Sequence, residues 1–373
     1  MTFKKKLCFL MPVHYLVARG GGAETQVRMV MDEIGKRKNY EIHFLCRRVP
    51  DYQPNNHKIW KIGSEHGFGK FWTFIDAARI FRTLKHISPE IIYQNVGCAY
   101  TGIAAMFAKR YGARFIWHIA SDVDLKPELA NNNIKSRFIK GLDRIFLNYG
   151  IRNANMIAGQ TKYQSTLLEK KFGRKCDAFI PIGHPYPKCL KKKTENVTIL
   201  WVAGVKPLKQ PEIFVKLARE FSRTTDASFV MMGHPFKGKW FYRLLEKINT
   251  APNLTYIGGV SQNEVNRRLG EGHILVSTSQ YEGFSNTFVQ AWMRKVPVVS
   301  LNADPDNIIV REGIGFKSLT FEKLSRDVKL LIENRELREE MGKKALQYAY
   351  KNHCVEKMVN SFLSLIESPK NYP

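Results

Sequence analysis

The stretch QYEGFSNTFVQAWMRKVPVVS, residues 280–300, reads as a loop, a helix and a buried strand in succession. Glu282 stands at the start of the loop, and Gln290 lies inside the helix eight positions later, about two helical turns away. An acid and an amide at this spacing are able to contact two parts of one elongated ligand. Backbone N–H groups at Asn286 and Thr287, where the helix begins, would then face an anion between them. The alternative is an ordinary loop followed by a core helix.

The alternation of apolar runs and amphipathic stretches continues on both sides of this segment. Strands that alternate with helices favour parallel α/β sheets. HPYPKCLKKKTEN, residues 184–196, has two prolines and three consecutive lysines and is typical of a linker. We therefore expect two doubly wound α/β domains, whose ligands bind beyond the carboxyl ends of the strands. The predicted strands are 7–13, 41–46, 90–94, 114–119, 154–158, 178–182, 197–203, 228–232, 254–257, 273–277 and 296–300, and the last predicted helix is 354–366.

The composition indicates a basic, globular protein. The 373 residues carry a formal net charge of +26, and their hydrophobic content of 44% is enough for sizeable cores. Residues 1–190 hold 31 Lys and Arg against 14 Asp and Glu, a net charge of +17, and residues 191–373 hold 28 against 19, a net charge of +9. This excess indicates an anionic partner: nucleic acid, anionic lipid or an anionic small substrate. No helix-turn-helix, zinc-finger or RNA-binding signature is present in the sequence, which argues against nucleic acid.

The cysteines and the N-terminal segment bear on the cellular compartment. Six widely spaced cysteines form no CxxC pair, which argues against a disulfide framework or zinc site and favours a reducing, cytoplasmic compartment. The start MTFKKKLCFLMPVH resembles a signal peptide, but its apolar run is short and His14 ends it. We therefore interpret this run as the first buried strand. No run approaches the ~20 apolar residues that a membrane span needs.

Two basic, aromatic helical stretches in the first half indicate an anionic membrane surface as a further partner. KFWTFIDAARIFRTLKH, residues 70–86, and NNNIKSRFIKGLDRIFLNYGIRN, residues 131–153, interleave aromatic and apolar residues with lysines and arginines. A lipid-linked acceptor at the inner face of the membrane would account for this charge. The alternative is a pair of core-packed helices with solvated basic side chains.

Several loops at the predicted strand ends carry residues suited to a ligand. VARGGGAETQV brings Gly21 and Gly22 to the start of a helix, where backbone N–H groups suit a phosphate, although a plain turn also uses glycines. His118 ends a strand in FIWHIASDVD and is either a site residue or a packed core histidine. Lys206 and Lys209 in WVAGVKPLKQPEIFVKLA precede a helix, where cations would hold a diphosphate. Two solvated lysines are the alternative.

Weaker signals come from two glycine loops and two acidic pairs. Gly233 in VMMGHP, and Ile257 with Gly258 in NLTYIGGV, follow predicted strands, where a small backbone loop could receive a flat base. D-x-D pairs occur at residues 122–124 and 304–306. We interpret both pairs as non-metal, because neither has a recognisable coordination shell around it.

The segment EGFSNTFVQAWMRKVPVVS resembles the signature of the retaining glycosyltransferases of family 4, in which an acid, seven residues and a second acid precede Ala, an apolar run and PVV. GGGAETQV resembles the first glycine-rich loop of that family, and WVAGVKPLKQPEIF resembles its strand, loop and helix with a phosphate-binding lysine. The resemblance runs nearly end to end and implies the GT-B fold, two Rossmann-like domains facing across a cleft that holds the nucleotide-sugar. The expected domains are 1–187, onto which 354–373 packs back, and 188–353.

The resemblance implies a role for each matching position. Glu282 would contact the hydroxyl groups of the transferred sugar, and Lys209 would bind the donor diphosphate. His118 would contact the donor sugar and act with these two residues in catalysis. Gln290 replaces the acid that usually hydrogen-bonds the nucleotide ribose. The other implied donor-binding positions are Gly21, Gly22, Lys206, Gly233, Ile257, Gly258, Gly283, Ser285, Asn286 and Thr287.

The implied function is a retaining glycosyltransferase that moves a sugar from a UDP- or GDP-linked donor to a glycan or lipid-linked acceptor, in cell-surface polysaccharide synthesis. The family needs no cofactor and no metal. Gly204 aligns with the arginine that usually accompanies the phosphate-binding lysine, and Lys206 would supply the missing charge. The departures at Gly204 and Gln290 keep an alternative open, a catalytically weak GT-B scaffold or glycan-binding subunit.

Overall fold

The computed structural model describes residues 4–17, 21–37, 39–63, 75–126, 137–190, 192–236 and 238–369, with only the backbone for 137–140. The chain divides into two compact units: Met1–Gly183 together with Val355–Pro373, and His184–Cys354. The predicted linker therefore falls within the second unit, and the boundaries lie after Gly183 and Cys354, against the expected 187 and 353. Gly20 and large parts of both predicted basic stretches lie outside the described residues.

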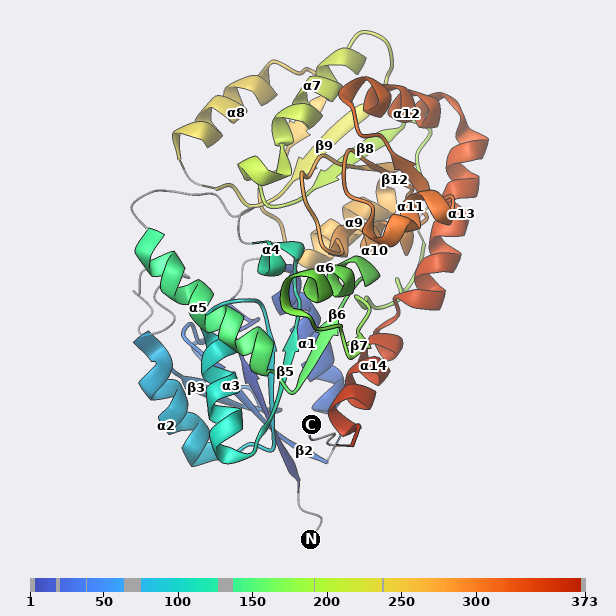
Figure 1. Ribbon diagram of the computed structural model, residues 1–373. Helices are drawn as coiled ribbons and strands as arrows, with labels where there is room; N and C mark the ends of the chain where they lie inside the picture. Colours follow the sequence, from blue (N-terminus) through green and yellow to red (C-terminus); the bar gives the residue numbers. More distant parts are fainter. Residues whose placement is uncertain are drawn as a thin grey trace. The chain divides into compact units, whose positions relative to one another are not determined.

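The first unit is built on a seven-stranded parallel sheet in the order β3-β2-β1-β4-β5-β6-β7, with helices on both faces (Figure 1). Its strands are β1 (Lys5–Leu10), β2 (Tyr40–Cys46), β3 (Lys58–Lys61), β4 (Ile91–Asn95), β5 (Arg114–His118), β6 (Met156–Gly159) and β7 (Ala178–Phe179). Its helices are α1 (Gly22–Ile34), α2 (Ala77–Ile87), α3 (Ala99–Tyr111), α4 (Asp122–Leu125), α5 (Arg137–Asn153), α6 (Lys162–Phe172) and α14 (Val355–Glu367).

Alternate residues of β1 supply two separate cores. Leu7 and Phe9 pack with side chains of α1 and α14, whereas Cys8 and Leu10 pack with α2, α3 and α5. Because β1 is buried on both faces, a continuous apolar run marks it in the sequence. The last helix completes the first of these cores, where Phe362 stacks on Phe9 with ring centroids 6.1 Å apart. Helix α14 thus packs on the first unit, the position the family resemblance implied.

The second unit is built on a six-stranded parallel sheet in the order β10-β9-β8-β11-β12-β13. Its strands are β8 (Thr198–Val202), β9 (Ser228–Met232), β10 (Leu254–Tyr256), β11 (Ile274–Ser277), β12 (Val298–Ser300) and β13 (Gly315–Lys317). Its helices are η4 (Pro207–Lys209), α7 (Pro211–Phe221), α8 (Lys239–Asn249), α9 (Gln262–Glu271), α10 (Asn286–Trp292), η5 (Pro305–Asn307), α11 (Ile308–Arg311), α12 (Phe321–Glu333) and α13 (Arg335–Asn352), of which η4 and η5 are short 3-10 helices. Among the helices described in either unit, none is both long and apolar enough to cross a bilayer.

The predicted strands differ from the observed ones mainly at the sheet edges. Strands β3 and β13 were not predicted, because KIWK and GFK contain no apolar run that marks a buried strand. The first strand was predicted to extend to residue 13, whereas β1 ends at Leu10. Pro12 has no N–H group to contribute to a strand ladder, so the regular pairing stops there and only an isolated bridge between Val13 and Arg48 follows.

Each sheet reverses its strand order beside its own first strand. The reversal falls between β1 and β4 in the first sheet and between β8 and β11 in the second. Ligands of doubly wound sheets bind at such reversals, just beyond the carboxyl ends of the strands. The segments that follow β1, β4, β8 and β11 are therefore the places where a site is expected.

Candidate functional site

Lys209 and Glu282 meet at the strand reversal of the second sheet. Lys209 ends η4, which follows β8, and Glu282 lies in the loop between β11 and α10. Their side chains form an ion pair in which 14% of the lysine and 16% of the glutamate side chain are exposed. The structure thus brings together two predicted catalytic residues that lie 73 positions apart in the sequence.

A chain of hydrogen bonds from the core holds this ion pair. Trp201 Nε1, on β8, donates to Thr278 Oγ1 at 2.9 Å, and Thr278 Oγ1 donates to the main-chain oxygen of Lys209 at 2.7 Å. Ser279 Oγ donates to Glu282 Oε1 at 2.7 Å. Because Thr278 is fully buried, its hydroxyl fixes η4 to the end of β11. Thr278 and Ser279 were not predicted as site residues, although both follow directly after a predicted strand, where ligands of this fold class bind.

Helix α10 begins after Ser285, as the sequence predicted. The side-chain oxygens of Ser285 and Thr287 lie 2.9 Å apart, and Gly283 is buried in the preceding turn. His184 Nε2 lies 3.0 Å from Asn286 Oδ1. Burial lowers the pKa of His184 to about 3, so the ring is neutral near pH 7 and its Nε2–H donates to the asparagine. His184, predicted as part of a linker, instead supports the first turn of α10.

Gln290 occupies a different environment from Glu282. Its side chain is 1% exposed, and Nε2 donates to Asn266 Oδ1 of α9 at 2.9 Å. Its main-chain oxygen accepts a hydrogen bond from Arg294 at 2.9 Å. The acid and the amide of the 280–300 segment therefore have separate partners, the acid on Lys209 and the amide on α9.

The predicted loop residues Lys206, Gly233, Ile257 and Gly258 lie on adjoining loops after β8, β9 and β10. Gly233 N–H donates to the Gly258 oxygen at 2.8 Å, and Phe236 N–H donates to the main-chain oxygen just before Lys206 at 2.9 Å. Gly258 has φ +74°, in the left-handed region that favours glycine. A Cβ at Gly233 would overlap the main chain after β8, 1.7 Å from an oxygen. Glycine is therefore required at position 233 by the close packing of these loops, and at position 258 by the backbone conformation.

The first unit holds the remaining predicted residues. Gly21 is the N-cap of α1 and Gly22 its first residue, and a Cβ at Gly21 would lie 1.9 Å from Glu24 Oε2. His118 ends β5, is 4% exposed, and has Nδ1 2.6 Å from Tyr93 Oη. Burial lowers the pKa of His118 to about 4, so its ring is neutral near pH 7. Gly21 and Gly22 follow β1, and His118 ends β5. These two strands are the neighbours of β4 in the sheet.

Both D-x-D pairs have structural hydrogen bonds. Asp124 Oδ2 accepts from the main-chain N–H of Ser121 at 3.2 Å and closes the first turn of α4, and Asp122 Oδ1 accepts from Gln164 Nε2 at 3.1 Å. Asp304 Oδ1 accepts a main-chain N–H at the start of α11 at 2.8 Å. Among the side chains that the structure describes, no three His, Cys, Asp or Glu gather as metal ligands would.

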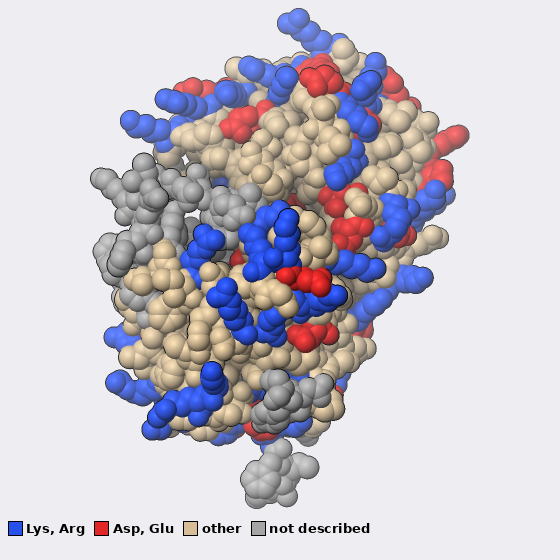
Figure 2. Space-filling view, in the orientation of Figure 1, with Lys and Arg blue, Asp and Glu red and all other residues tan. Residues whose placement is uncertain are grey.

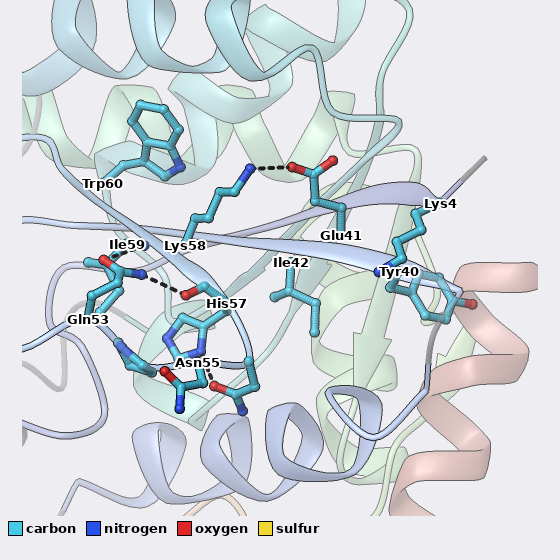
Figure 3. A pocket seen from close by; sticks show the side chains of 12 residues that line it. Lys4, Tyr40, Glu41, Ile42, Gln53, Asn55, His57, Lys58, Ile59 and Trp60 are labelled. Carbon is cyan, nitrogen blue, oxygen red and sulfur yellow. Dashed lines mark hydrogen bonds and ion pairs between the residues drawn. The ribbon is translucent and has the colours of Figure 1, made fainter. Parts of the chain in front are cut away.

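A cavity of about 470 Å³ lies at the β2–β3 edge of the first sheet (Figure 3). Lys58 Nζ forms an ion pair with Glu41 at 2.8 Å, and Gln53 Nε2 donates to the main-chain oxygen of His57 at 2.7 Å. These polar groups are paired with one another, and no predicted site residue lines the cavity. We therefore place the candidate site residues of each unit at the strand reversal of its own sheet.

Basic side chains are abundant on the face shown in Figure 2. On α2, Arg79, Arg82 and Lys85 are exposed, whereas Ile80 and Leu84 are fully buried in the core. The apolar side of this predicted basic helix is therefore occupied by the core and is not available for insertion into a bilayer. Its charged side remains open to solvent.

Comparison with known proteins gives a family match for part of the chain and two curated relatives, both trehalose synthases. Residues 186–348, within the second unit, match the profile of the family Glycosyl transferases group 1. Trehalose synthase from Thermococcus litoralis is 26% identical over 144 residues, which is 37% of this chain and 35% of that protein. The chain thus spans about a third of the length of this curated relative.

Solved structures match nearly the whole chain. Sucrose-phosphate synthase from Thermosynechococcus elongatus has a TM-score of 0.79 at 12% identity, covering 97% of this chain and 98% of that one. WaaG, a glycosyltransferase involved in lipopolysaccharide biosynthesis, has a TM-score of 0.77 at 13% identity, covering 97% and 100%. HepE of Anabaena, solved in complex with UDP-glucose, has a TM-score of 0.76 at 16% identity, covering 98% and 100%. The chain therefore has the expected GT-B fold, and its residues 186–348 match the glycosyl transferases group 1 family.

Proposed function

We propose that this protein is a retaining, metal-independent glycosyltransferase that moves a hexosyl group from a nucleoside-diphosphate donor to a glycan or lipid-linked acceptor. The observation that carries the proposal is the Lys209–Glu282 pair at the strand reversal of the unit that matches the family. The complexes of HepE with UDP and UDP-glucose support a nucleotide-sugar donor. The relation to WaaG supports a role in cell-surface glycan synthesis.

In the proposed chemistry, Lys209 stabilises the leaving group. As the bond to the sugar breaks, negative charge develops on the diphosphate, and a preorganised ammonium stabilises it in a site with little water. Lys209 supplies this charge, and Lys206 adds a second cation on the same edge of the sheet. The main-chain N–H groups at the start of α10 supplement them.

The Glu282 carboxylate and the His118 imidazole are each proposed to hydrogen-bond sugar hydroxyl groups. Glu282 leaves Lys209 when the diphosphate arrives and accepts hydrogen bonds from the sugar hydroxyl groups. His118, neutral because it is buried, is able to donate or accept one hydrogen bond with a sugar hydroxyl group at the first unit. The leaving phosphate oxygen takes the acceptor proton on the face it departs from, so the anomeric configuration is retained without an enzymic nucleophile.

A donor screen tests this function. The purified protein is mixed with UDP-, GDP- and ADP-sugars with and without EDTA, and thermal shift and nucleoside-diphosphate release are measured. We expect one donor class to raise the melting temperature, since it binds only the folded state, and to be consumed equally with EDTA. Lys209→Ala should lose both effects. If no nucleotide-sugar shifted the melting temperature or was consumed, the proposal would be wrong.

A second candidate function is a glycan-binding or scaffold subunit with the same fold. Gln290 favours it, because a neutral amide stands where the family has an acid and its Nε2 is bonded to α9. The glycine at position 204 favours it as well. Donor-induced thermal stabilisation without turnover on any acceptor would support this function over transfer.

Peripheral attachment to an anionic membrane is the localisation we propose. The exposed basic side of α2 and the net charge of +26 support electrostatic attraction without insertion. The protein should float together with phosphatidylserine vesicles at low salt. Above a few hundred millimolar salt it should no longer do so, because the charges are then screened. Equal flotation with phosphatidylcholine vesicles would contradict attachment through charge.

A further inference from the structure

The carboxyl end of β4 holds a buried amide without a partner. Asn95 is the last residue of β4, at the strand reversal of the first sheet, and is 1% exposed. Neither its Oδ1 nor its Nδ2 has a hydrogen-bond partner among the described residues. Burial of an unpaired amide is unfavourable, so an external group, water or a ligand, must complete its hydrogen bonds. The sequence analysis did not single out this residue.

His118, on the neighbouring strand, presents a third unpartnered atom. Asn95 and His118 are register partners on the parallel strands β4 and β5, so their side chains leave the sheet on the same face. Tyr93, two residues before Asn95 on that face, holds His118 Nδ1 through its hydroxyl at 2.6 Å. His118 Nε2 has no partner within the part of the chain that the structure describes. Three unsatisfied polar atoms therefore belong to two side chains on the same face, at the carboxyl ends of two neighbouring strands.

The backbone at this point is strained. Val96, directly after Asn95, has φ +119°, a conformation that is an outlier for a β-branched residue. Gln94 Nε2 donates to the main-chain oxygen of Val96 and helps to hold the turn. Local strain of this kind persists where the surroundings enforce it, and it occurs preferentially at ligand sites.

We propose that Asn95 is a further sugar-contacting residue, which extends the contact already implied for His118 into a charge-neutral binding site for hydroxyl groups at the carboxyl ends of β4 and β5. The amide offers two donors and an acceptor, and the imidazole offers one further donor or acceptor. Two neutral groups match hydroxyl groups, which donate and accept as the displaced water does, but do not balance the charge of a phosphate. The proposal rests on the proposed function in that a transferred or accepting sugar is the expected occupant.

The neighbouring residue Gln94 provides a matched control. It is also fully buried on β4, but its Oε1 accepts from Thr101 Oγ1 at 2.8 Å and its Nε2 lies 3.6 Å from Cys98 Sγ. Replacing Gln94 by leucine removes the acceptor of the buried Thr101 O–H, while the oxygen of that hydroxyl still accepts from the Cys98 main-chain N–H at 3.3 Å. Replacing Asn95 by leucine, which has a similar shape, removes only groups that the protein itself leaves unpaired.

The test compares Asn95→Leu with Gln94→Leu in the full chain by urea unfolding, UDP binding and sugar transfer. We expect Asn95→Leu to unfold at the same or higher urea concentration than the parent, to bind UDP normally, and to lose at least tenfold in kcat/KM. Gln94→Leu should unfold at lower urea. If Asn95→Leu were destabilised as Gln94→Leu is, or transferred sugar at the parent rate, the proposal would be overturned.

A binding measurement separates this inference from the transferase proposal. Saturation-transfer NMR with glucose, galactose and N-acetylglucosamine at millimolar concentration reports on the sugar site alone. If the parent turns over no donor yet shows a signal that Asn95→Leu abolishes, the result supports the sugar-site proposal and contradicts the transferase proposal. If the parent shows no signal and no turnover, both fail.

Discussion

At the scale of single residues, the proposed donor chemistry depends on the ion pair between Lys209 and Glu282. Glu282 and Lys209 were predicted separately, from a loop and from a strand end, and the structure pairs them. Gln290 Nε2 donates to Asn266, a contact that the sequence did not indicate, and the role of Gln290 at the ribose stays a prediction. Periodicity places a residue on a helix or in a loop, but it does not show which distant side chain meets it, because that depends on strand order.

The ion pair leads to a prediction about product binding. A free nucleoside diphosphate must displace Glu282 from Lys209, and it has no transferred sugar whose hydroxyl groups could donate to the freed carboxylate. A nucleotide-sugar does supply those hydroxyl groups. Glu282→Gln should therefore abolish transfer yet bind UDP more tightly, by about tenfold, the size expected for one charge-assisted contact. Isothermal titration with UDP and a transfer assay measure the two effects.

Glu339→Gln is the control for this variant, since it removes a carboxylate from the exposed Arg335–Glu339 pair on α13. It should leave both measurements unchanged, which excludes a general effect of net charge. UDP affinity in Glu282→Gln equal to or weaker than in the parent would show that the carboxylate does not compete for the lysine.

Restoring the family acid is a second residue-scale prediction. In Gln290→Glu the new carboxylate is able to accept from Asn266 if that amide turns over, so the contact between α9 and α10 survives. A carboxylate binds a ribose hydroxyl more strongly than an amide oxygen does. Donor affinity should therefore be kept or improved, as measured by titration. Loss of turnover in this variant would mean that the position is not at the ribose.

At the scale of elements, every central strand was predictable, whereas of the four edge strands in the two described sheets only β7 and β10 were predicted. The apolar runs of β1, β4 and β9 arise because both faces of a parallel sheet are covered by helices. The edge strands β3 and β13 have three or four residues, and their pairing depends on a neighbour rather than on their own composition. The hydrogen bonds from Trp201 through Thr278 to the end of η4 were equally invisible, because they join residues far apart in the chain.

This link between β11 and η4 leads to an element-scale prediction. Thr278→Val keeps the shape but removes the hydroxyl, leaving the buried Trp201 Nε1–H without its acceptor. Unfolding free energy should fall by about 1–3 kcal/mol. Because η4 carries Lys209, the KM for the donor should rise as well. Thr278→Ser retains the hydroxyl and should restore the KM; failure of serine to do so would mean that volume, not hydrogen bonding, positions the lysine.

At the scale of the whole molecule, the buried histidines form a feature common to both units. Burial lowers the pKa of His14 and His184 to about 3, and those of His57, His118 and His273 to about 4. His14 and His57 share a hydrogen bond of 2.9 Å between their Nε2 atoms, which requires one nitrogen to lack a proton. If both rings were protonated, the two Nε2–H donors would face each other with no acceptor between them.

These lowered values determine how stability changes with pH. In the unfolded chain each histidine titrates near its ordinary pKa of about 6.5, so between about pH 6.5 and 4 the unfolded state binds more protons than the folded state. Stability therefore rises with pH in this window and falls as the solution is acidified. Urea unfolding at pH 7.5, 6.0 and 5.0 should give a steadily decreasing midpoint, since most carboxylates remain ionised above pH 5. His57→Gln should reduce this slope, whereas a midpoint independent of pH would contradict neutral, buried histidines.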